Sequence, residues 1–291
     1  MTELIRTLES ILNQFDVAVL DQWGVLHNGS VPYPYTVSAM RMLQQHGKQI
    51  LIVSNSGKRA ELNRQRIENI GLPADTITKV VTSGEALWED VTERRLQLNG
   101  KVPVTFFPIC AKQSDPIDWA AGSDIEIRSR LDHTVDAILL MGLPDGTACD
   151  GYDAVFAAAL KLQIPVVCSN PDKSSPRAGG LVTSPGALAH RYEKMGGVVL
   201  WYGKPHAAVY RAVVRSFPDT PSNRFLMVGD SLEHDIAGAQ SVGFLSVFIR
   251  RGIHADDFST ATTDVQIEEV GQQLVTAAGV NPPDFSLEFL R

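Results

Sequence analysis

The stretch Phe225-Leu-Met-Val-Gly-Asp230-Ser-Leu-Glu-His-Asp235 holds an apolar run that ends on glycine and aspartate, and a second acid follows five residues later. A similar run near the N-terminus, Val17-Ala-Val-Leu-Asp21, also stops on an aspartate. Because the carboxyl ends of parallel strands share one edge of an open α/β sheet, we expect the carboxylates of Asp21 and Asp230 to meet there. The two runs therefore predict a parallel sheet with acidic chemistry at its carboxyl edge.

The remaining sequence alternates strand-like apolar runs with helical patterns, which is typical of βαβ units around a parallel sheet. We predict an α/β fold with a Rossmann-like core that comprises residues 1–83 and 185–291. The stretch 84–184 has strands of its own and is predicted to be an inserted α/β domain.

Three further runs complete the predicted elements. An amphipathic pattern over residues 1–12 predicts an N-terminal helix. The apolar run 198–202 is assigned to a strand of the core, after the insert. The run 245–249 is assigned to the final strand of that core.

Composition and charge limit the classes of partner. The chain has 291 residues, of which 44% are hydrophobic and 20% charged, and its formal net charge of −7 argues against nucleic-acid binding. No stretch approaches the roughly 18 apolar residues of a membrane span, so no membrane partner is expected. Three scattered cysteines suit a reducing, cytoplasmic location. A homo-oligomer is compatible with this composition, which does not fix the oligomeric state.

Polar residues follow other predicted strands. Asp21 precedes Gly24, which permits a tight turn, and its carboxylate suits a nucleophile, a metal ligand or simply an Asx turn. Ser54 and Asn55 end the second strand, where a hydroxyl and loop amides either hold a phosphoryl oxygen or start a helix. Lys204 lies between a strand and a helix, where it either neutralises a phosphate or is a solvated surface charge.

The pair Asp230 and Asp235 is the most specific of these signals. A carboxylate at a strand end and a second acid in the next turn suit a hard, oxygen-preferring ion such as Mg²⁺. The alternative is a helix N-cap followed by an acid that the helix dipole favours. The combination of these residues, in this order on one sheet, favours the catalytic interpretation.

The ordered set resembles the haloacid dehalogenase superfamily of aspartate-nucleophile hydrolases. Asp21 matches the nucleophile of the first motif, Ser54 the hydroxyl of the second and Lys204 the lysine of the third. Asp230 and Asp235 match the acids of the fourth motif. The resemblance covers essentially the whole chain and implies that the insert is a cap domain.

The position of the insert indicates which subfamily the chain resembles. It lies between the second and third motifs, with Asn170-Pro171-Asp172 late in it and Gly203-Lys204-Pro205 after it, which is similar to the class IIA phosphatases. That group acts on small phosphorylated metabolites. The resemblance thus implies a phosphohydrolase whose substrate contacts come from Ser54, Asn55, Lys204 and Asp172.

The same resemblance implies a Mg²⁺-dependent mechanism. The ion would be bound by Asp21, the main-chain carbonyl of Trp23 and Asp230, with Asp235 in support. Asp21 would attack phosphorus to give an aspartyl-phosphate, which water then cleaves. The ion and Lys204 would offset the repulsion between the anionic nucleophile and the anionic phosphate.

Trp23 departs from the family pattern, because phosphatases of the family carry an aspartate there as general acid and base. An indole exchanges no proton at neutral pH, so a contribution of about 10²–10⁴-fold must come from elsewhere or is lost. His27, His206 and Asp172 are candidate substitutes for the missing acid.

The departure leaves several functions open. The substrate could instead have a leaving group that needs little protonation, or turnover could be slow. A different hypothesis is a non-catalytic protein that binds a phosphorylated metabolite. Dehalogenases of the superfamily also carry an aromatic residue at this position, but they lack the metal and the Gly229-Asp230 pair, which argues against that chemistry here.

Overall fold

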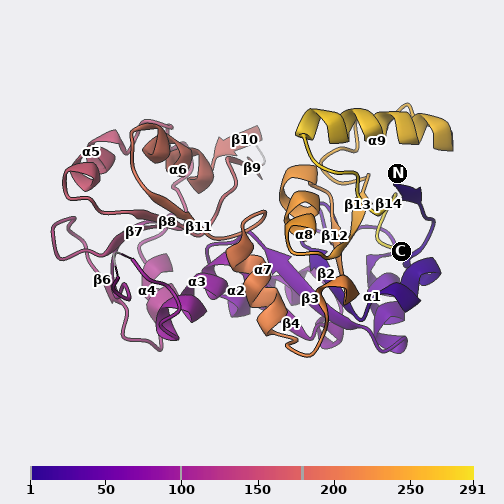
Figure 1. Cartoon of the computed structure of the whole chain (residues 1–291), viewed down its shortest axis with the longest axis horizontal. Coiled ribbons are helices and arrows are strands. Elements are labelled where there is room, and N and C mark those ends of the chain that lie inside the picture. Colours follow the sequence, from indigo (N-terminus) through magenta and orange to yellow (C-terminus); the bar gives the residue numbers. More distant parts are fainter. Residues whose placement is uncertain (1, 99, 178–179) are drawn as a thin grey trace. The chain divides into compact units, whose positions relative to one another are not determined.

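The computed structural model describes residues 2–98, 100–177 and 180–291. Met1, Asn99, Ala178 and Gly179 belong to the predicted domains but lie outside the described residues. The chain forms two compact units (Figure 1). The first contains Met1–Ser54, Glu61–Val81 and Tyr210–Arg291, and the second contains Asn55–Ala60 and Thr82–Val209.

The first unit is built on a seven-stranded sheet with the strand order β1-β14-β13-β12-β2-β3-β4. Its strands are β1 (Glu3–Leu4), β2 (Val17–Asp21), β3 (Gln49–Ser54), β4 (Lys79–Thr82), β12 (Phe225–Gly229), β13 (Leu245–Ile249) and β14 (Phe285–Leu287). The two aspartate-terminated runs are the neighbouring strands β2 and β12, which pair in parallel with Val228 opposite Leu20. Both runs are almost completely buried, as expected for the apolar centre of a parallel sheet. The α/β class with a parallel-sheet core is confirmed.

The first unit also contains all or most of several helices. They are α1 (Thr36–Gln45), α2 (Ala60–Ile70), α7 (Ala207–Arg215), α8 (Ala237–Ser241) and α9 (Asp264–Ala278). Helix α9 begins with a capping box between Thr263 and Gln266 and ends at Gly279, whose φ of 66° suits glycine. Among the residues that the structure describes, no helix is long and apolar enough to cross a membrane.

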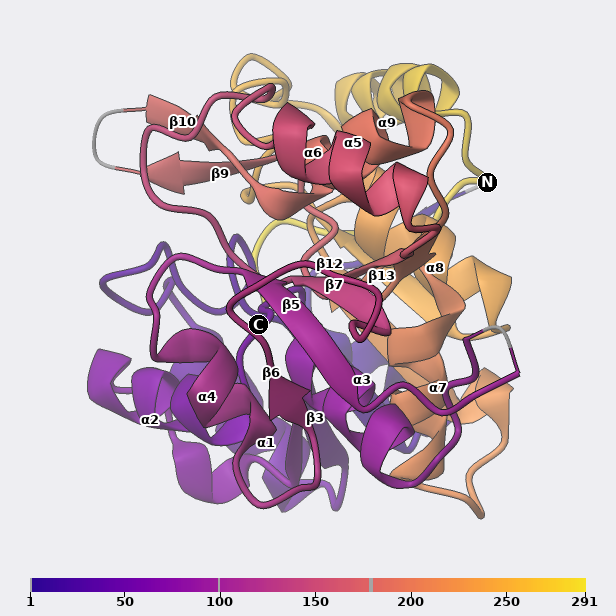
Figure 2. The same ribbon diagram turned by 90° about the vertical axis from the view of Figure 1, so that its left-hand side faces the viewer.

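The second unit has its own five-stranded parallel sheet with the order β11-β8-β7-β5-β6. Its strands are β5 (Thr105–Ile109), β6 (Glu126–Ile127), β7 (Ala137–Leu140), β8 (Val166–Cys168) and β11 (Val199–Trp201). The helices are α3 (Ser83–Thr92), α4 (Asp115–Ala120), α5 (Asp153–Lys161) and α6 (Pro185–Lys194). Strands β9 (Ser174–Arg177) and β10 (Gly180–Thr183) form a separate antiparallel pair (Figure 2).

Three element predictions were wrong. Strand β11 pairs with β8 in the five-stranded sheet, so the run 198–202 is not a strand of the first sheet. The N-terminal segment forms the short strand β1 and a 3₁₀ helix, Leu8–Gln14, because backbone pairing with β14 takes precedence over the helical pattern. Strand β14, not β13, is the last strand. The division into core and cap at residues 84 and 184 stays a prediction.

Candidate active site

Three carboxylates meet at the carboxyl edge of the first sheet. Asp21 is the last residue of β2, Asp230 directly follows β12, and Asp235 lies in a single π-helical turn, Leu232–Ile236. Each offers an oxygen that lies within 4.8 Å of the others. The structure therefore brings together the three acids that the sequence singled out.

Asp230 is held in place by backbone on three sides. Its carboxyl oxygen Oδ2 accepts a hydrogen bond of 2.8 Å from the backbone N–H of Ile253. A Cβ atom on Gly24, whose φ is +83°, would lie 1.7 Å from the same oxygen, and one on Gly252 would lie 2.1 Å from it. Sequence reasoning missed Gly252 and Ile253, because only the loop after β13 brings them to the carboxylate.

Asp235 is fixed by the turn that follows β12. Its Oδ2 accepts a hydrogen bond of 3.1 Å from the backbone N–H of Ser231, whose own Oγ accepts one of 3.2 Å from His234 N–H. Gly229 leaves space for this acid, because a Cβ there would lie 2.2 Å from the Cβ of Asp235. The Gly-Asp pair of the sequence is thus a packing requirement as well as a motif.

The three acids suit a divalent cation. Asp230 is 2% exposed and Asp235 is completely buried. Carboxylates this close together repel one another in a poorly hydrated site unless a cation lies among them. Carboxylate oxygens are also the donors that Mg²⁺ and Ca²⁺ prefer. On donor chemistry, spacing and burial, the residues fit such an ion.

We predict that Gly252→Ala disables this site. The added methyl group cannot coexist with Asp230 Oδ2, so the carboxylate must move and affinity for a divalent cation should fall by at least about tenfold. Calorimetric titration with Mg²⁺ measures this. The matched control is Gly271→Ala in α9, where a Cβ would meet no heavy atom within 4 Å. That variant should keep its affinity and gain stability of about 1 kcal/mol; equal affinities for both variants would contradict the assigned role of Gly252.

Trp23 is held against its own loop. The residue is 37% exposed, and its indole meets the His27 ring edge-on at a centroid distance of 5.4 Å. The guanidinium of Arg66 lies 5.0 Å from the indole centroid, a cation–π distance. Gly29, at φ +99°, lets the indole lie against the loop backbone, because a Cβ at position 29 would lie 2.2 Å from Cη2 of the indole. The indole of Trp23 is therefore held by His27, Arg66 and the Gly29 backbone, in a residue that is partly open to solvent.

His27 is poorly suited to replace the missing acid. The ring is completely buried, and Nδ1 accepts a 2.9 Å hydrogen bond from Gly29 N–H, which places the single proton on Nε2. Nε2 has no hydrogen-bond partner among the described residues. Burial, and to a lesser degree the positive charge of Arg66, lowers the pKa of His27 to about 4. A neutral imidazole of this kind has no proton to give near pH 7.

The buried neutral imidazole should make stability depend on pH. The unfolded state, with a pKa near 6.5, binds more protons than the folded state, so stability is fully present above pH 6.5 and falls as the pH drops towards 4. The loss amounts to about 3 kcal/mol. Urea unfolding at several pH values should show that His27→Gln lacks this part of the slope, whereas His46→Gln, at an exposed position, retains it. An unchanged slope in His27→Gln would refute the buried neutral state.

Tyr33 is a residue near the site that the sequence did not reveal. Burial raises the pKa of its phenol, and the negative charge of Asp230 raises it further. Its backbone N–H donates to Leu26 O at 2.9 Å, and its ring packs 6.3 Å from that of Phe289. This influence of Asp230 on Tyr33 depends on the fold of the loop between β2 and α1, which no local sequence pattern encodes.

Ser54 ends β3, the strand beside β2. Val53 stands opposite Asp21 in the parallel register, so Ser54 follows at the same carboxyl edge. Ser54 is 8% exposed. The structure thus places the predicted hydroxyl one strand away from the predicted nucleophile.

The second unit brings together Asn55, Asp172 and Lys204. The amide oxygen of Asn55 accepts a 2.7 Å hydrogen bond from Lys204 N–H, and its Nδ2 donates to Lys204 O at 3.3 Å. The same Nδ2 donates to Asp172 Oδ1 at 2.8 Å. Asn55 therefore positions the backbone of Lys204, and its predicted contact with substrate stays a prediction. His206, the remaining candidate acid, stacks on Trp201 at a centroid distance of 5.2 Å.

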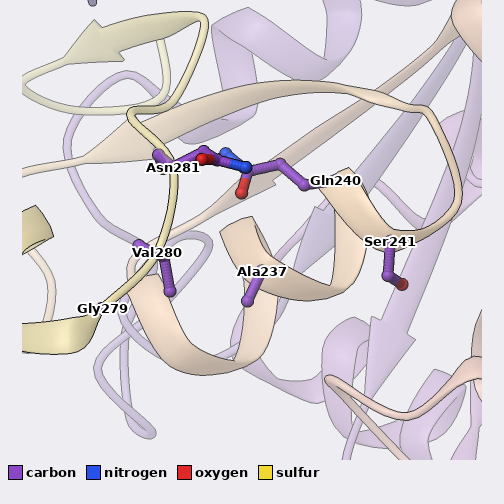
Figure 3. A pocket seen from close by; sticks show the side chains of 6 residues that line it. All are labelled: Ala237, Gln240, Ser241, Gly279, Val280 and Asn281. Atoms are coloured by element: carbon purple, nitrogen blue, oxygen red, sulfur yellow. The ribbon is translucent and has the colours of Figure 1, made fainter.

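A separate open pocket of about 340 Å³ lies between α8 and the segment after α9 (Figure 3). Gln240 spans it, with Nε2 donating to Asn281 O at 2.9 Å and to Pro282 O at 3.2 Å. None of the predicted site residues lines it, so we assign it no chemistry. Its lining residues are Ala237, Gln240, Ser241, Gly279, Val280 and Asn281.

Comparison with known families agrees with this geometry. The model of the haloacid dehalogenase-like hydrolases matches residues 18–108, which contain β3 and all of β2 except Val17, with their polar ends. A second model, of HAD-hydrolase-like proteins, matches residues 201–276, which contain β12 and its acids. The chain is a haloacid dehalogenase-like hydrolase of the class IIA type. The resemblance inferred from the motifs is thereby confirmed.

Relatives of this hydrolase match it along most of its length. Chronophin of Rattus norvegicus is 26% identical over 300 residues, which cover 95% of this chain and 92% of the relative. A haloacid dehalogenase-like hydrolase from Brucella suis has the same fold, with a TM-score of 0.78 at 24% identity over 99% and 100% of the two chains. The glycerol phosphate phosphatase of Mycobacterium tuberculosis, solved in complex with calcium, superposes with a TM-score of 0.67 at 21% identity, over 88% and 72%.

Proposed function

We propose that this hydrolase is a Mg²⁺-dependent phosphatase that acts on a small phosphorylated metabolite through an aspartyl-phosphate. The observation that carries the proposal is the meeting of Asp21 with Asp230 and Asp235 at one sheet edge. A glycerol phosphate phosphatase with the same fold supports the substrate class. The three clustered acids argue against a dehalogenase, which needs no metal.

The cation of the proposal would be held by Asp21, Asp230 and the main-chain carbonyl of Trp23, with Asp235 in support. When bound, it lowers the negative charge that an anionic phosphate meets at this edge. The calcium complex of the related fold agrees with an oxygen-binding divalent cation, and Mg²⁺ is our proposal for this chain.

In the proposed reaction, a carboxylate oxygen of Asp21 attacks phosphorus while the bond between phosphorus and the leaving oxygen breaks. Water then attacks the phosphorus of the aspartyl-phosphate, which restores the Asp21 carboxylate and releases inorganic phosphate. Ser54 would donate a hydrogen bond to a phosphoryl oxygen whose charge grows in the transition state. Lys204 would balance phosphate charge, a role that follows from its place in the sequence motif.

Trp23 limits which substrates suit this site. The indole cannot protonate the leaving oxygen, and His27 is a buried, neutral imidazole whose Nδ1 accepts a hydrogen bond from Gly29 N–H. We therefore propose that substrates with a good leaving group, such as acyl or aryl phosphates, turn over faster than alkyl phosphates. Asp172 and His206 stay as candidate proton donors in the second unit.

The proposal is tested by the metal dependence of phosphate release. With acetyl phosphate or p-nitrophenyl phosphate, activity should vanish in EDTA and return when Mg²⁺ is added in excess. Asp230→Asn should weaken Mg²⁺ binding and reduce activity by at least about 10²-fold, because it removes a charged ligand. Asp75→Asn, at an exposed acid that pairs with Arg41, is the control and should leave activity unchanged. Activity that persists in EDTA would contradict the metal assignment.

A second candidate is a protein that binds a phosphorylated metabolite without hydrolysing it. The observation that favours it is Trp23, which is fixed where the family places a proton donor. Thermal shift with a panel of phosphorylated metabolites, followed by phosphate-release assays of each stabilising ligand, separates the two. Turnover of a stabilising ligand would reject the binding-only function.

A further inference from the structure

Arg250 is a buried cation in the first unit that the proposed reaction does not use. It directly follows β13 and is only 6% exposed. Its backbone is fixed by β14, because Arg250 N–H donates to Leu287 O at 3.0 Å. Among the described residues, its guanidinium makes one hydrogen bond, from Nη1 to the neutral Ser286 Oγ at 2.9 Å. Most of its five N–H donors are therefore without a protein acceptor.

The acids around Arg250 are already paired with other arginines. Asp264 accepts two hydrogen bonds from Arg6, at 2.7 and 2.9 Å. Glu288 pairs with Arg251 at 3.3 Å. These four residues are the charges that act on Arg250, and their two positive and two negative charges balance. Arg250 is the excess positive charge of the group.

A buried cation without a counter-charge is costly, and the cost is removed when an anion binds. Burial also lowers the pKa of the Arg250 guanidinium. The planar fork of a guanidinium matches the spacing of two oxygens on a phosphate or sulfate, so the unused donors can bind such a group with two hydrogen bonds.

We propose that the Arg250 guanidinium, positioned by its hydrogen bond to Ser286, forms a binding site for a small inorganic oxyanion such as phosphate or sulfate. The site belongs to the β13–β14 side of the sheet and is distinct from the carboxylate cluster. Its ligand is an anion, whereas the three carboxylates suit a cation, so the two sites differ in chemistry as well as in residues. The remaining exposed part of Arg250 provides the access.

Phosphate titration in EDTA, followed by thermal unfolding at constant ionic strength with chloride as the balancing salt, tests the site. In the wild-type protein, a phosphate concentration tenfold above the dissociation constant should raise the Tm by about 3 °C. Arg250→Met should raise that dissociation constant by at least about tenfold, because it removes the charged donors. Arg251→Met changes the same charge one residue away, at a side chain that is 42% exposed, and should retain the phosphate response.

Equal phosphate responses in the wild type and Arg250→Met would overturn the proposal, and so would the loss of the response in Arg251→Met alone. If Arg250→Met does not fold, crystals of the wild-type protein soaked in selenate decide the question. An anomalous peak within hydrogen-bonding distance of the Arg250 guanidinium supports the site, and selenate bound only at other positions refutes it. None of these readouts depends on catalysis. They therefore test the anion site even if the protein proves not to be a phosphatase.

Discussion

Asp21→Asn should reduce phosphate release from p-nitrophenyl phosphate by at least about 10³-fold, because the amide is a far weaker nucleophile than the carboxylate. The substitution changes one atom of a side chain that ends β2 beside the buried pair Asp230 and Asp235. The fold should therefore persist, and circular dichroism with thermal unfolding verifies this. Steady-state kinetics with saturating Mg²⁺ gives the loss.

Loss of activity alone does not distinguish a nucleophile from a metal ligand, so a second readout is needed. Wild-type protein that is acid-quenched during turnover of ³²P-labelled acetyl phosphate should retain label that hydroxylamine releases, as expected for an acyl phosphate. Asp21→Asn should retain none, and Asp75→Asn should behave as wild type. Labelling of Asp21→Asn equal to that of the wild type would remove Asp21 as the nucleophile.

Trp23→Asp is the prediction with the next largest effect, and it acts in the opposite direction. A carboxyl group at this position could protonate the leaving oxygen and activate water, which is worth about 10²–10⁴-fold when proton transfer limits the rate. We expect a gain on this scale for an alkyl phosphate, whose leaving group is a poor one. For p-nitrophenyl phosphate the gain should be under about tenfold, because its leaving group needs no proton.

The control for Trp23→Asp is Trp23→Asn. Both variants lose the indole contacts with His27 and Arg66, so any difference between them reports the carboxyl group and not the lost packing. The kcat/KM of each variant is measured on both phosphate classes. A gain of the same size for both leaving groups, or in both variants, would show that proton supply is not what Trp23 removes.

The meeting of acids at the carboxyl edge of the first sheet could be predicted because its signals are local. The runs that end in Asp21 and Asp230 are apolar enough to be interior strands, and parallel pairing places their ends together. Ser54 follows from the same rule, since β3 lies beside β2. The family motifs then predict chemical roles for these positions, and those roles stay predictions.

Other features depend on contacts that no local pattern encodes. The apolar run of β11 is equally compatible with either sheet, and only its pairing with β8 assigns it to the second unit. Strands β1 and β14 are too short to leave a periodic signal. The contacts of Gly252 and Ile253 with Asp230 arise because a loop folds back after β13. Likewise, the hydrogen bond from Lys204 N–H to Asn55 joins residues that are 149 positions apart in the sequence.

The wide separation of β2 and β12 in the chain has a consequence for biosynthesis. Asp230, the neighbour of Asp21 in the fold, is translated 209 residues after it. At roughly 5–20 residues per second, the nascent chain waits on the order of tens of seconds before the central strand pair can form. All residues of the second unit are made in that interval, so we expect it to fold first and the cluster of Asp21, Asp230 and Asp235 to be completed only afterwards.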